Sequence, residues 1–524
     1  MKILPSIQCD DMSESKKQSP VGIDLGTTFS VIAYVNENGR PESIPNAEGD
    51  LLTPSTVLFD EEEVIVGKEA AKALASELDQ VAECPKRQIG QRVYDKKIAG
   101  RRYPPEALQG WILQKLKQDA MRVVGDFDQA VITVPAYFDE VRRKATQDSG
   151  MIAGIEVQDI INEPTSAAIA YGFQNGWLDL KGVAVEKTRF LVYDLGGGTF
   201  DVSIMEADHC DFKTIATDGD YQLGGRDWDQ RLIDHVANAF KDEHGFDPRE
   251  NSDALGKLIR DCKEAKETLS ARGRASVTCA FGSSTMRVDV TRDEFLRMTQ
   301  DLLDRTDFTV RQTMKQANMK WTDIDRVLLV GGSTRMPAVQ DLLQSLSGSS
   351  PDNSLSPDEA VAHGAAIRSA MLTKDYRETL PINSIRNVNS HTLGVVANEV
   401  ETGIPQVVQL IPRNTPIPVT SRRIFKTHKA DQESILVQIV EGESTNPADC
   451  SQIGRCTIWD LPENLPVGTP IEVKFGYEEN GRLRIKVKIG GEDRRSFRYE
   501  LKRANGLTLE QLESWRQYIS GAGS

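Results

Sequence analysis

Along most of the chain, short apolar runs alternate with stretches in which apolar residues recur every three or four positions. AVITVPAYF, from Ala130 to Phe138, is one such run, and a stretch of helical period follows it from about Asp139. Strands that alternate with helices are typical of α/β architecture. The pattern therefore predicts an α/β region from residue 21 to about residue 372.

From His391 to Leu501 the apolar period shortens to two. Pro, Gly and Asn turns separate seven short alternating runs: TLGVVAN, QVVQLI, SRRIFKT, SILVQIV, CTIWDL, IEVKFGY and RLRIKVKIG. The pair Asn480-Gly481 lies between the last two runs and is a strong hairpin signal. These features predict an all-β sandwich or barrel-like domain.

Prolines and capping residues mark several helix starts. Pro164 and Pro337 stand where helices are expected to begin, and the helix SPDEAVAHGAAIRSAML is expected to start with a Ser356 cap. Near the C-terminus, Thr508 and Gln511 have capping-box spacing. One apolar stripe follows them and predicts a short terminal helix: Leu512, Trp515 and Ile519.

Composition narrows the class of protein. A chain of 524 residues is longer than a single hydrophobic core usually supports, so we expect two or more domains. The net charge of −15 disfavours broad contact with nucleic acid or an anionic membrane, although a local basic site stays open. Residues 1–19 have too short an apolar core for a signal peptide, and no apolar run approaches the ~18 residues of a transmembrane helix. We therefore expect a soluble cytoplasmic protein with a loose N-terminal tail.

The seven cysteines are scattered and form no CxxC pair. Cys450 and Cys456 are close enough in sequence for a disulfide or a metal site. The favoured interpretation is that all seven are thiols in a reducing compartment.

Glycine turns after apolar runs provide the candidate chemistry. In FLVYDLGGGTFDVSIM, three glycines lie between Asp194 and Asp201, so several backbone N–H groups can converge on an anion. The flanking carboxylates would act through a divalent cation or a water. VGIDLGTTFSVIAYV repeats the arrangement around Asp24, and RVLLVGGSTRMP supplies a third glycine turn. An ordinary hairpin remains the alternative for the first of these turns when it is taken alone.

Other motifs limit the kind of site. Glu163 lies at the carboxyl end of an expected strand, where open α/β sheets bind ligands. Lys86 and Arg87 would ordinarily form a solvated surface pair. No GxxxxGK[ST] occurs, and no GxGxxG has the required context, so P-loop and dinucleotide folds are disfavoured. The residues alone indicate a phosphate- or nucleotide-binding α/β domain joined to a β domain.

The chain closely resembles the DnaK-type chaperone family, the seventy-kilodalton heat-shock class within the actin, sugar-kinase and heat-shock ATPase superfamily. The resemblance extends over roughly residues 20–515 and rests on these motifs: GIDLGTTFSVIAY, TVPAYF, IINEPTSAAIAYG, DLGGGTFDVSI, LGGRDWD, VLLVGGSTRMP, PDEAVAHGAAI, LIPRNTPIP and VQIVEGE. It implies a two-lobed actin-like ATPase domain with duplicated ribonuclease-H-like subdomains, followed by a β-sandwich peptide-binding domain. The implied boundaries are a disordered tail at 1–19, the ATPase domain at 20–375, a linker at 376–390, the β domain at 391–505, and a short helix, the lid remnant, at 506–524.

By this resemblance the first domain binds ATP or ADP with Mg²⁺, and K⁺ is a further candidate cation. Catalysis is assigned to one lysine, which positions the attacking water, one threonine and three carboxylates: Lys86, Thr199, Glu163, Asp194 and Asp201. Mg²⁺, held through water, is assigned to Asp24 and Asp194. The implied nucleotide contacts are Gly26, Thr27, Thr28, Gly196, Gly197, Gly198, Thr199, Gly224, Gly225, Lys266, Ser270, Gly331, Gly332, Ser333, Arg335 and Asp358.

The resemblance also implies a site for an extended apolar peptide in the β domain. Phe425, Ile435 and Val437 match pocket-forming positions, and Val407 and His428 match positions that arch over the peptide. Sandwich core is an equally good interpretation of Ile435 and Val437.

The implied function is that of a stress-response chaperone that hydrolyses ATP and couples nucleotide state to transient binding of unfolded polypeptides. A J-domain co-chaperone and a nucleotide exchange factor are the expected partners, the protein is expected to be a monomer, and neither nucleic acid nor a membrane is expected. Two alternatives stay open. One is a weakly hydrolysing, ATP-binding relative that acts as an exchange factor or scaffold, and the other is a small-molecule kinase of the superfamily.

The chain departs from the family at four places. Lys263 and Glu267 replace a Glu and an Arg of many members, although their opposite charges could pair. The interval from Lys86 to Ala130 is short, which suggests a trimmed subdomain and an altered exchange-factor surface. The linker leaves three apolar residues to bury, so weaker coupling is a hypothesis: Ile382, Ile385 and Val388. The sequence also stops where the family has a long lid, and faster peptide release is expected without one.

Overall fold

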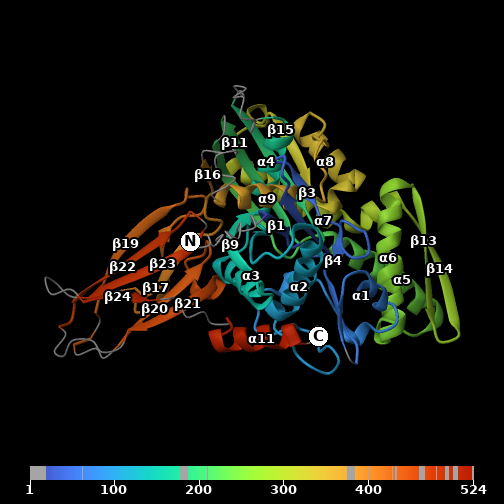
Figure 1. Ribbon diagram of the computed structural model, residues 1–524, viewed down its shortest axis with the longest axis horizontal. Coiled ribbons are helices and arrows are strands. Elements are labelled where there is room, and N and C mark those ends of the chain that lie inside the picture. Colours follow the sequence, from blue (N-terminus) through green and yellow to red (C-terminus); the bar gives the residue numbers. More distant parts are fainter. Residues whose placement is uncertain are drawn as a thin grey trace, which may run out of the picture.

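The computed structural model describes residues 19–61, 63–176, 187–208, 211–373, 384–399, 402–427, 429–430, 434–458, 466–479, 481–489, 495–499 and 506–521. It is a mixed α/β protein with several sheets and a C-terminal helix, as the sequence predicts (Figure 1). The first 18 residues and most of the expected linker lie outside the described residues.

The first large sheet has the order β3-β2-β1-β8-β9, with β4 paired to β2. Its strands are β1 Val21–Asp24, β2 Phe29–Val35, β3 Pro41–Ser43, β4 Thr53–Pro54, β8 Gln129–Val134 and β9 Glu156–Asn162. Successive side chains of β2 point to opposite faces of the sheet, because side chains alternate along a strand. Ile32 packs on the side of helices α2 Pro105–Val124 and α3 Glu140–Ile152, whereas Val31 and Ala33 pack against α9 Ala360–Leu372.

The second large sheet has the order β15-β10-β11-β12-β16. Its strands are β10 Thr188–Leu195, β11 Phe200–Asp208, β12 Asp211–Asp220, β15 Arg326–Val330 and β16 Ser384–Arg386. Tyr193 and Phe200 are fully buried on the side of the later helices, while Phe190 and Val192 pack toward α9 and α4 Glu163–Gln174. Helices α4 and α9 therefore share an apolar core with both large sheets. This shared core joins the two sheets.

The remaining elements of the α/β region extend these two units. The helices are α1 Lys68–Ala73, α5 Gly225–His244, α6 Ser252–Ala271, α7 Arg292–Gln316 and α8 Pro337–Ser347. The smaller sheets are formed by β5 Thr56–Phe59, β6 Val64–Val66 and β7 Val81–Glu83, and by β13 Arg274–Phe281 with β14 Ser284–Thr291.

The β region consists of two four-stranded antiparallel sheets that share one apolar core. Strands β18 Pro405–Ile411, β17 Leu393–Asn398, β20 Ile435–Glu441 and β21 Ser451–Ile458 form one sheet. Strands β19 Val419–Lys426, β22 Pro470–Tyr477, β23 Leu483–Ile489 and β24 Arg495–Tyr499 form the other, and β24 is the one strand among these that the sequence pattern did not predict. The β22–β23 hairpin is confirmed, with Gly481 at φ 76, while Asn480 lies outside the described residues.

The terminal helix, α11 Leu509–Gly521, packs on α2 and α3 of the α/β region (Figure 1). Its predicted capping box is confirmed, because the Thr508 N–H donates to Gln511 Oε1 at 2.9 Å and the Gln511 N–H donates to Thr508 Oγ1 at 3.2 Å. Leu512 and Ile519 are buried against the first core, and Trp515 packs edge-on against Trp111. The predicted apolar stripe thus faces another part of the chain.

The expected Ser356 cap is wrong. Helix α9 begins at Ala360, because the carbonyl of Pro357 accepts a hydrogen bond from the Gly331 N–H at 3.0 Å and the chain turns before the helix starts. The thiol of Cys450 is free, so it forms no disulfide with Cys456. Among the described residues, no helix has both the length and the apolar content needed to cross a membrane.

Part of the expected linker forms β16, which pairs in parallel with β12. Ile385 is partly buried beside Phe212, and Val388 is 4% exposed. The third apolar residue, Ile382, lies outside the described residues. Two of the three apolar residues that the sequence singled out are therefore packed.

Candidate functional site

A cleft of about 450 Å³ lies where the turns of the two large sheets meet. The turn between β1 and β2 contributes Thr27 and Thr28, and the turn between β10 and β11 contributes Gly196, Gly197 and Thr199. A Cβ on Gly197 would lie 1.8 Å from Thr28 Oγ1, and one on Gly198 would lie 2.5 Å from Thr27 Cγ2. Only bare backbone fits between the two hairpin turns at these two positions.

The second glycine pair lies against the same turn. The Gly225 N–H donates to the Gly196 carbonyl at 3.0 Å, and the Arg226 N–H donates to the Gly197 carbonyl at 2.8 Å. A Cβ on Gly224 would lie 2.3 Å from the Gly198 nitrogen. Gly26, Gly331 and Gly332 also line the cleft, and Gly331 has φ 82. The separate glycine turns of the sequence therefore form one concave backbone surface suited to an anion.

Lys86 is buried at the floor of this cleft. It lies in a short 3₁₀ helix, Pro85–Gln88, and its Nζ is 2.5 Å from Glu163 Oε1. Burial alone would lower the pKa of Lys86, but the charges of Glu163 and Asp24 outweigh it and raise that pKa above its ordinary value. Arg87 donates to Asp227 at 3.2 Å and is also partly buried. The interpretation of Lys86 and Arg87 as a solvated surface pair is therefore wrong.

Three aspartates surround the Lys86–Glu163 pair. Asp24 accepts from Thr133 Oγ1 at 3.1 Å, and Asp201 accepts from the Tyr137 N–H at 2.9 Å. Burial, and then the charge of Glu163, raise the pKa of Asp24 to about 7 and that of Asp201 to about 8. The same two causes raise the pKa of Asp194 well above its usual range.

The carboxylates of Asp24, Asp194 and Asp201 are better suited to bind a hard divalent cation than to lie close together without one. The buried Asp194 Oδ2 has no hydrogen-bond partner among the described residues. Within the same part of the chain, no three Asp, Glu, His or Cys side chains stand close enough to ligate a metal together. Mg²⁺ commonly keeps several waters and binds through one or two carboxylates, so an oxygen-only site with an unpartnered carboxylate oxygen suits it.

The other end of the cleft is lined by charged and hydroxyl side chains of α5, α6 and the turn after β15. Lys266 pairs with Asp229 at 2.8 Å and donates to the Gly225 carbonyl at 3.0 Å, and Ser333 Oγ donates to the Gly196 carbonyl at 2.9 Å. Arg335 pairs with Asp358 at 2.6 Å and is 57% exposed, so one of its faces is open to a ligand. Ser270 lines the same wall.

Two pairs at this end were not predicted from the sequence. Lys263 lies over the Phe29 ring, 4.9 Å from its centre, and forms no ion pair with Glu267 among the described contacts. Arg226 pairs with Glu83 at 2.5 Å. Phe29 directly follows the Thr27-Thr28 turn. This position is the only sequence signal that could have identified Phe29 as a site residue, because the sequence does not indicate that α6 packs against it.

The residues expected to bind peptide are mostly packed. Val437 is 3% exposed in the core between the two β-region sheets, and Val407 is 5% exposed. Phe425 is half-buried against that core. His428 and the side chain of Ile435 lie outside the described residues.

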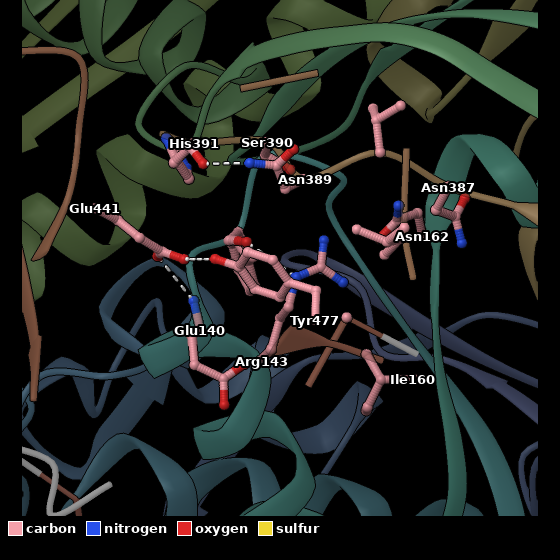
Figure 2. Close-up of a pocket in the computed structure, with 14 residues that line it drawn as sticks. Glu140, Arg143, Ile160, Asn162, Asn387, Asn389, Ser390, His391, Glu441 and Tyr477 are labelled. Atoms are coloured by element: carbon pink, nitrogen blue, oxygen red, sulfur yellow. Dashed lines mark hydrogen bonds between the residues drawn. The ribbon is translucent and has the colours of Figure 1, made fainter. Parts of the chain in front are cut away.

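The β region contacts the α/β region around a separate, small pocket (Figure 2). Glu441 Oε1 accepts from the Tyr477 hydroxyl at 2.7 Å, and its Oε2 accepts from the Glu140 N–H at the start of α3 at 3.2 Å. His391 Nε2 lies 2.9 Å from the Tyr137 carbonyl. The Tyr137 N–H is the group that donates to Asp201, so a single residue separates this buried carboxylate from the β region.

A second set of contacts joins the β region to the second sheet. Arg413 pairs with Asp218 at 3.0 Å, and Asn414 Oδ1 accepts from the Thr217 N–H at 2.9 Å. Asn414 also donates to Gln316 of α7 at 2.8 Å. The β region therefore contacts strand β12 of the second sheet as well as the segment that follows β8 and the start of α3.

The fold and the site define a class of protein: two α/β units joined around a cleft that presents glycine turns, a buried lysine and several carboxylates, with a two-sheet β region packed beside it. Comparison with known proteins gives the family. Residues 20–517 match the family model described as Hsp70 protein, and the chain belongs to the Hsp70 family.

Individual relatives agree with this assignment. The chain is 39% identical over 505 residues to proteins named Chaperone protein DnaK from two strains of Halobacterium salinarum, which covers 95% of the chain and 77% of each relative. It is also 39% identical over 483 residues to a Chaperone protein DnaK from Thermosipho melanesiensis, which covers 90% of the chain and 78% of that relative.

Proposed function

We propose that the protein is a chaperone that hydrolyses ATP and couples the nucleotide state to transient binding of unfolded polypeptide. The observation that carries this proposal is the buried Lys86–Glu163 pair, which faces the glycine turns across the cleft. Family membership and relatives named as DnaK chaperones support it. The mixed α/β architecture is in keeping with an actin-like ATPase domain at 20–375, a linker at 376–390 and a β-sandwich domain at 391–505.

In this proposal the concave backbone holds the terminal phosphates. Thr27, Thr28 and Thr199 direct hydroxyls at them, and Lys86 supplies a fixed positive charge beside the transferred group. Asp194 and Asp24 would hold Mg²⁺, which would supply positive charge to neutralise the phosphates. Phosphoryl transfer has a loose transition state, so the protein contributes mainly position and electrostatic stabilisation. Glu163 and Asp201 then orient a water rather than form a covalent bond.

The adenosine would occupy the wall formed by α6 and the turn after β15. Lys266 and Ser270 offer donors to the ribose, and the exposed face of Arg335 offers a stacking surface for the base. Gly332 lines this wall and lets a ligand approach the backbone. This placement keeps base and phosphates at opposite ends of one cleft.

Single-turnover hydrolysis of bound ATP tests the catalytic half of this proposal. We expect Lys86→Ala and Thr199→Ala to slow the chemical step about 100-fold, because each removes a preorganised group beside the transferred phosphate. Equilibrium binding of ATP is measured in parallel and should remain detectable in both variants. If the unmodified protein binds ATP but hydrolyses it no faster than the variants, an ATP-binding exchange factor or scaffold becomes the better assignment.

A further inference from the structure

A second cavity adjoins one wall of the cleft. It measures about 220 Å³ and is lined by the end of β15, the short 3₁₀ helix Gly332–Arg335, helix α8 and the segment before α9. Arg335 and Pro357 line both this cavity and the cleft, so the two spaces share part of one wall. We name it the α8 cavity, and its other lining residues are Leu329, Thr334, Gln340, Asn353 and Leu355.

Part of the α8 cavity is apolar. Leu329 and Leu355 are buried residues that line it, and Pro357 adds its ring. Because an apolar cavity of about 150 Å³ can hold benzene, this space is large enough for a single six-membered ring. The remaining volume leaves room for one small substituent on that ring.

The polar part of the cavity offers hydrogen-bond donors. Arg335 is the one charged residue of the lining, and its Nη2 pairs with Asp358 at 2.6 Å. In the described part of the chain no second carboxylate forms an ion pair with Arg335, so other N–H groups of the guanidinium remain available. The Asn353 amide has no hydrogen-bond partner among the described residues, and Gln340 Nε2 donates to the Thr334 carbonyl at a long 3.3 Å. A planar carboxylate matches such donors, because a guanidinium can bind it through two parallel hydrogen bonds.

Other small ligands match the cavity less well. A cation would lie beside Arg335, with no carboxylate among the lining residues to balance it. A nucleotide is too large, since sites for drug-sized ligands usually measure about 300–1,000 Å³. Inorganic phosphate would bond to Arg335 but would leave the surfaces of Leu329 and Leu355 without contacts.

We propose that the α8 cavity binds a small monocyclic carboxylate. The ring packs on Leu329, Leu355 and Pro357. The carboxylate accepts hydrogen bonds from Arg335 and Asn353.

A carboxylate in this place restricts the guanidinium of Arg335, whose other face is the proposed stacking surface for adenine. Because a preorganised contact costs less to form, the carboxylate and the nucleotide each bind more tightly in the presence of the other. The site itself stands on the geometry of the cavity. The coupling rests on the proposed function, because it requires a nucleotide beside Arg335.

Saturation-transfer NMR with benzoate tests the inference. Benzamide and benzylamine are the matched rings that carry a neutral and a positive group. Titrations are made at constant ionic strength, without nucleotide and with saturating ADP, which occupies the cleft. We expect benzoate to bind in both conditions with a Kd in the millimolar range, benzamide to bind at least about threefold more weakly, and benzylamine not to bind.

Three variants locate the binding. Gln340→Phe should abolish benzoate binding, because the new ring fills the cavity, and Asn353→Leu should weaken it about threefold to tenfold, as expected for one lost hydrogen bond. Gln344→Phe is the matched control, because Gln344 is exposed one turn further along α8, and it should bind benzoate unchanged. Retained affinity for ADP shows that each variant is folded, since none of the three residues lines the cleft.

The outcomes separate this inference from the proposed function. Saturating benzoate should lower the Kd of a fluorescent ADP analogue about fivefold, the lower end of ordinary coupling between two sites. If benzoate binds no better than benzamide, is displaced by ADP, or binds equally to Gln340→Phe and Gln344→Phe, the inference is overturned. If benzoate binds but leaves the affinity for ADP unchanged, the coupling is overturned. If benzoate binds as expected but no nucleotide does, the proposed function fails and the assignment of the α8 cavity stands.

Discussion

Lys86 and Glu163 come from segments 77 positions apart and meet as a buried ion pair at the floor of the cleft. Removal of one partner from a buried ion pair leaves an uncompensated charge, at a cost of about 3 to 5 kcal/mol. Asp24 and Asp194 would add to that cost, because their negative charges contribute to the raised pKa of Lys86. The effect of Lys86→Ala on hydrolysis is therefore interpretable only alongside the binding measurement.

Glu441 gives a prediction about pH. Burial, and then the charge of Asp139, raise the pKa of this carboxyl to about 7 from an ordinary 4.5. Below pH 4.5 the group is neutral in both folded and unfolded chains, whereas between 4.5 and 7 only the unfolded chain ionises it. Stability therefore falls as pH rises through this window, by up to about 3 kcal/mol. Glu441→Gln should remove this loss and raise Tm relative to the unmodified protein at pH 8, but not at pH 4.5.

The Tm difference between Glu441→Gln and the unmodified protein, measured across this pH range, checks the prediction. A difference that is constant with pH would mean that Glu441 does not titrate in this window.

Helix α11 gives a prediction at the scale of an element. A 13-residue helix is marginal in water by itself, so α11 depends on its packing against α2 and α3. Leu512 is 2% exposed, whereas Leu509 in the same helix is 77% exposed. Leu512→Ala should destabilise the docked helix by about 2 to 5 kcal/mol, and Leu509→Ala should have little effect.

Hydrogen exchange of the α11 amides measures this effect directly. Exchange should accelerate in Leu512→Ala and remain slow in Leu509→Ala, while β10 and β11 keep their protection in both variants. Equal protection in the two variants would show that the contact with the α/β region does not stabilise α11.

Local signals predicted many elements well. Pro164, Asp139 and the Thr508–Gln511 box each mark a helix start in the structure. Ser356 failed as a cap because a tertiary hydrogen bond between Gly331 and Pro357 decides where α9 begins, and no local pattern contains that bond. Strand β24 was missed because its residues, Arg495–Tyr499, carry too many charges for a clear alternation.

At the scale of the whole molecule, the site was predictable in its residue types but not in its assembly. Glycine turns and bracketing aspartates are visible in the sequence, and the family resemblance supplied Lys86. The Phe29–Lys263 contact and the Tyr137 link between Asp201 and His391 depend on how distant segments are brought together. Spacing along the chain carries no information about such contacts.

The contacts between the regions predict coupled behaviour. Tyr137 joins Asp201 to His391, and β16 extends the second sheet, so contiguous contacts connect the carboxylates of the α/β region with the β region. ATP should therefore accelerate release of a labelled apolar peptide, which stopped-flow fluorescence measures. His391→Ala should reduce the acceleration without abolishing peptide binding. An off-rate that ATP leaves unchanged would show that the two regions act independently despite these contacts.

The positions of β16 and α11 affect how the β region would dock again on the α/β region after the two regions separate. The chain enters this region from the second sheet through β16 and leaves it toward the first sheet through α11. A separated β region would therefore remain tethered at both ends, and its effective concentration at the interface would be set by the chain rather than by the solution. Redocking should then proceed at a rate that does not depend on protein concentration.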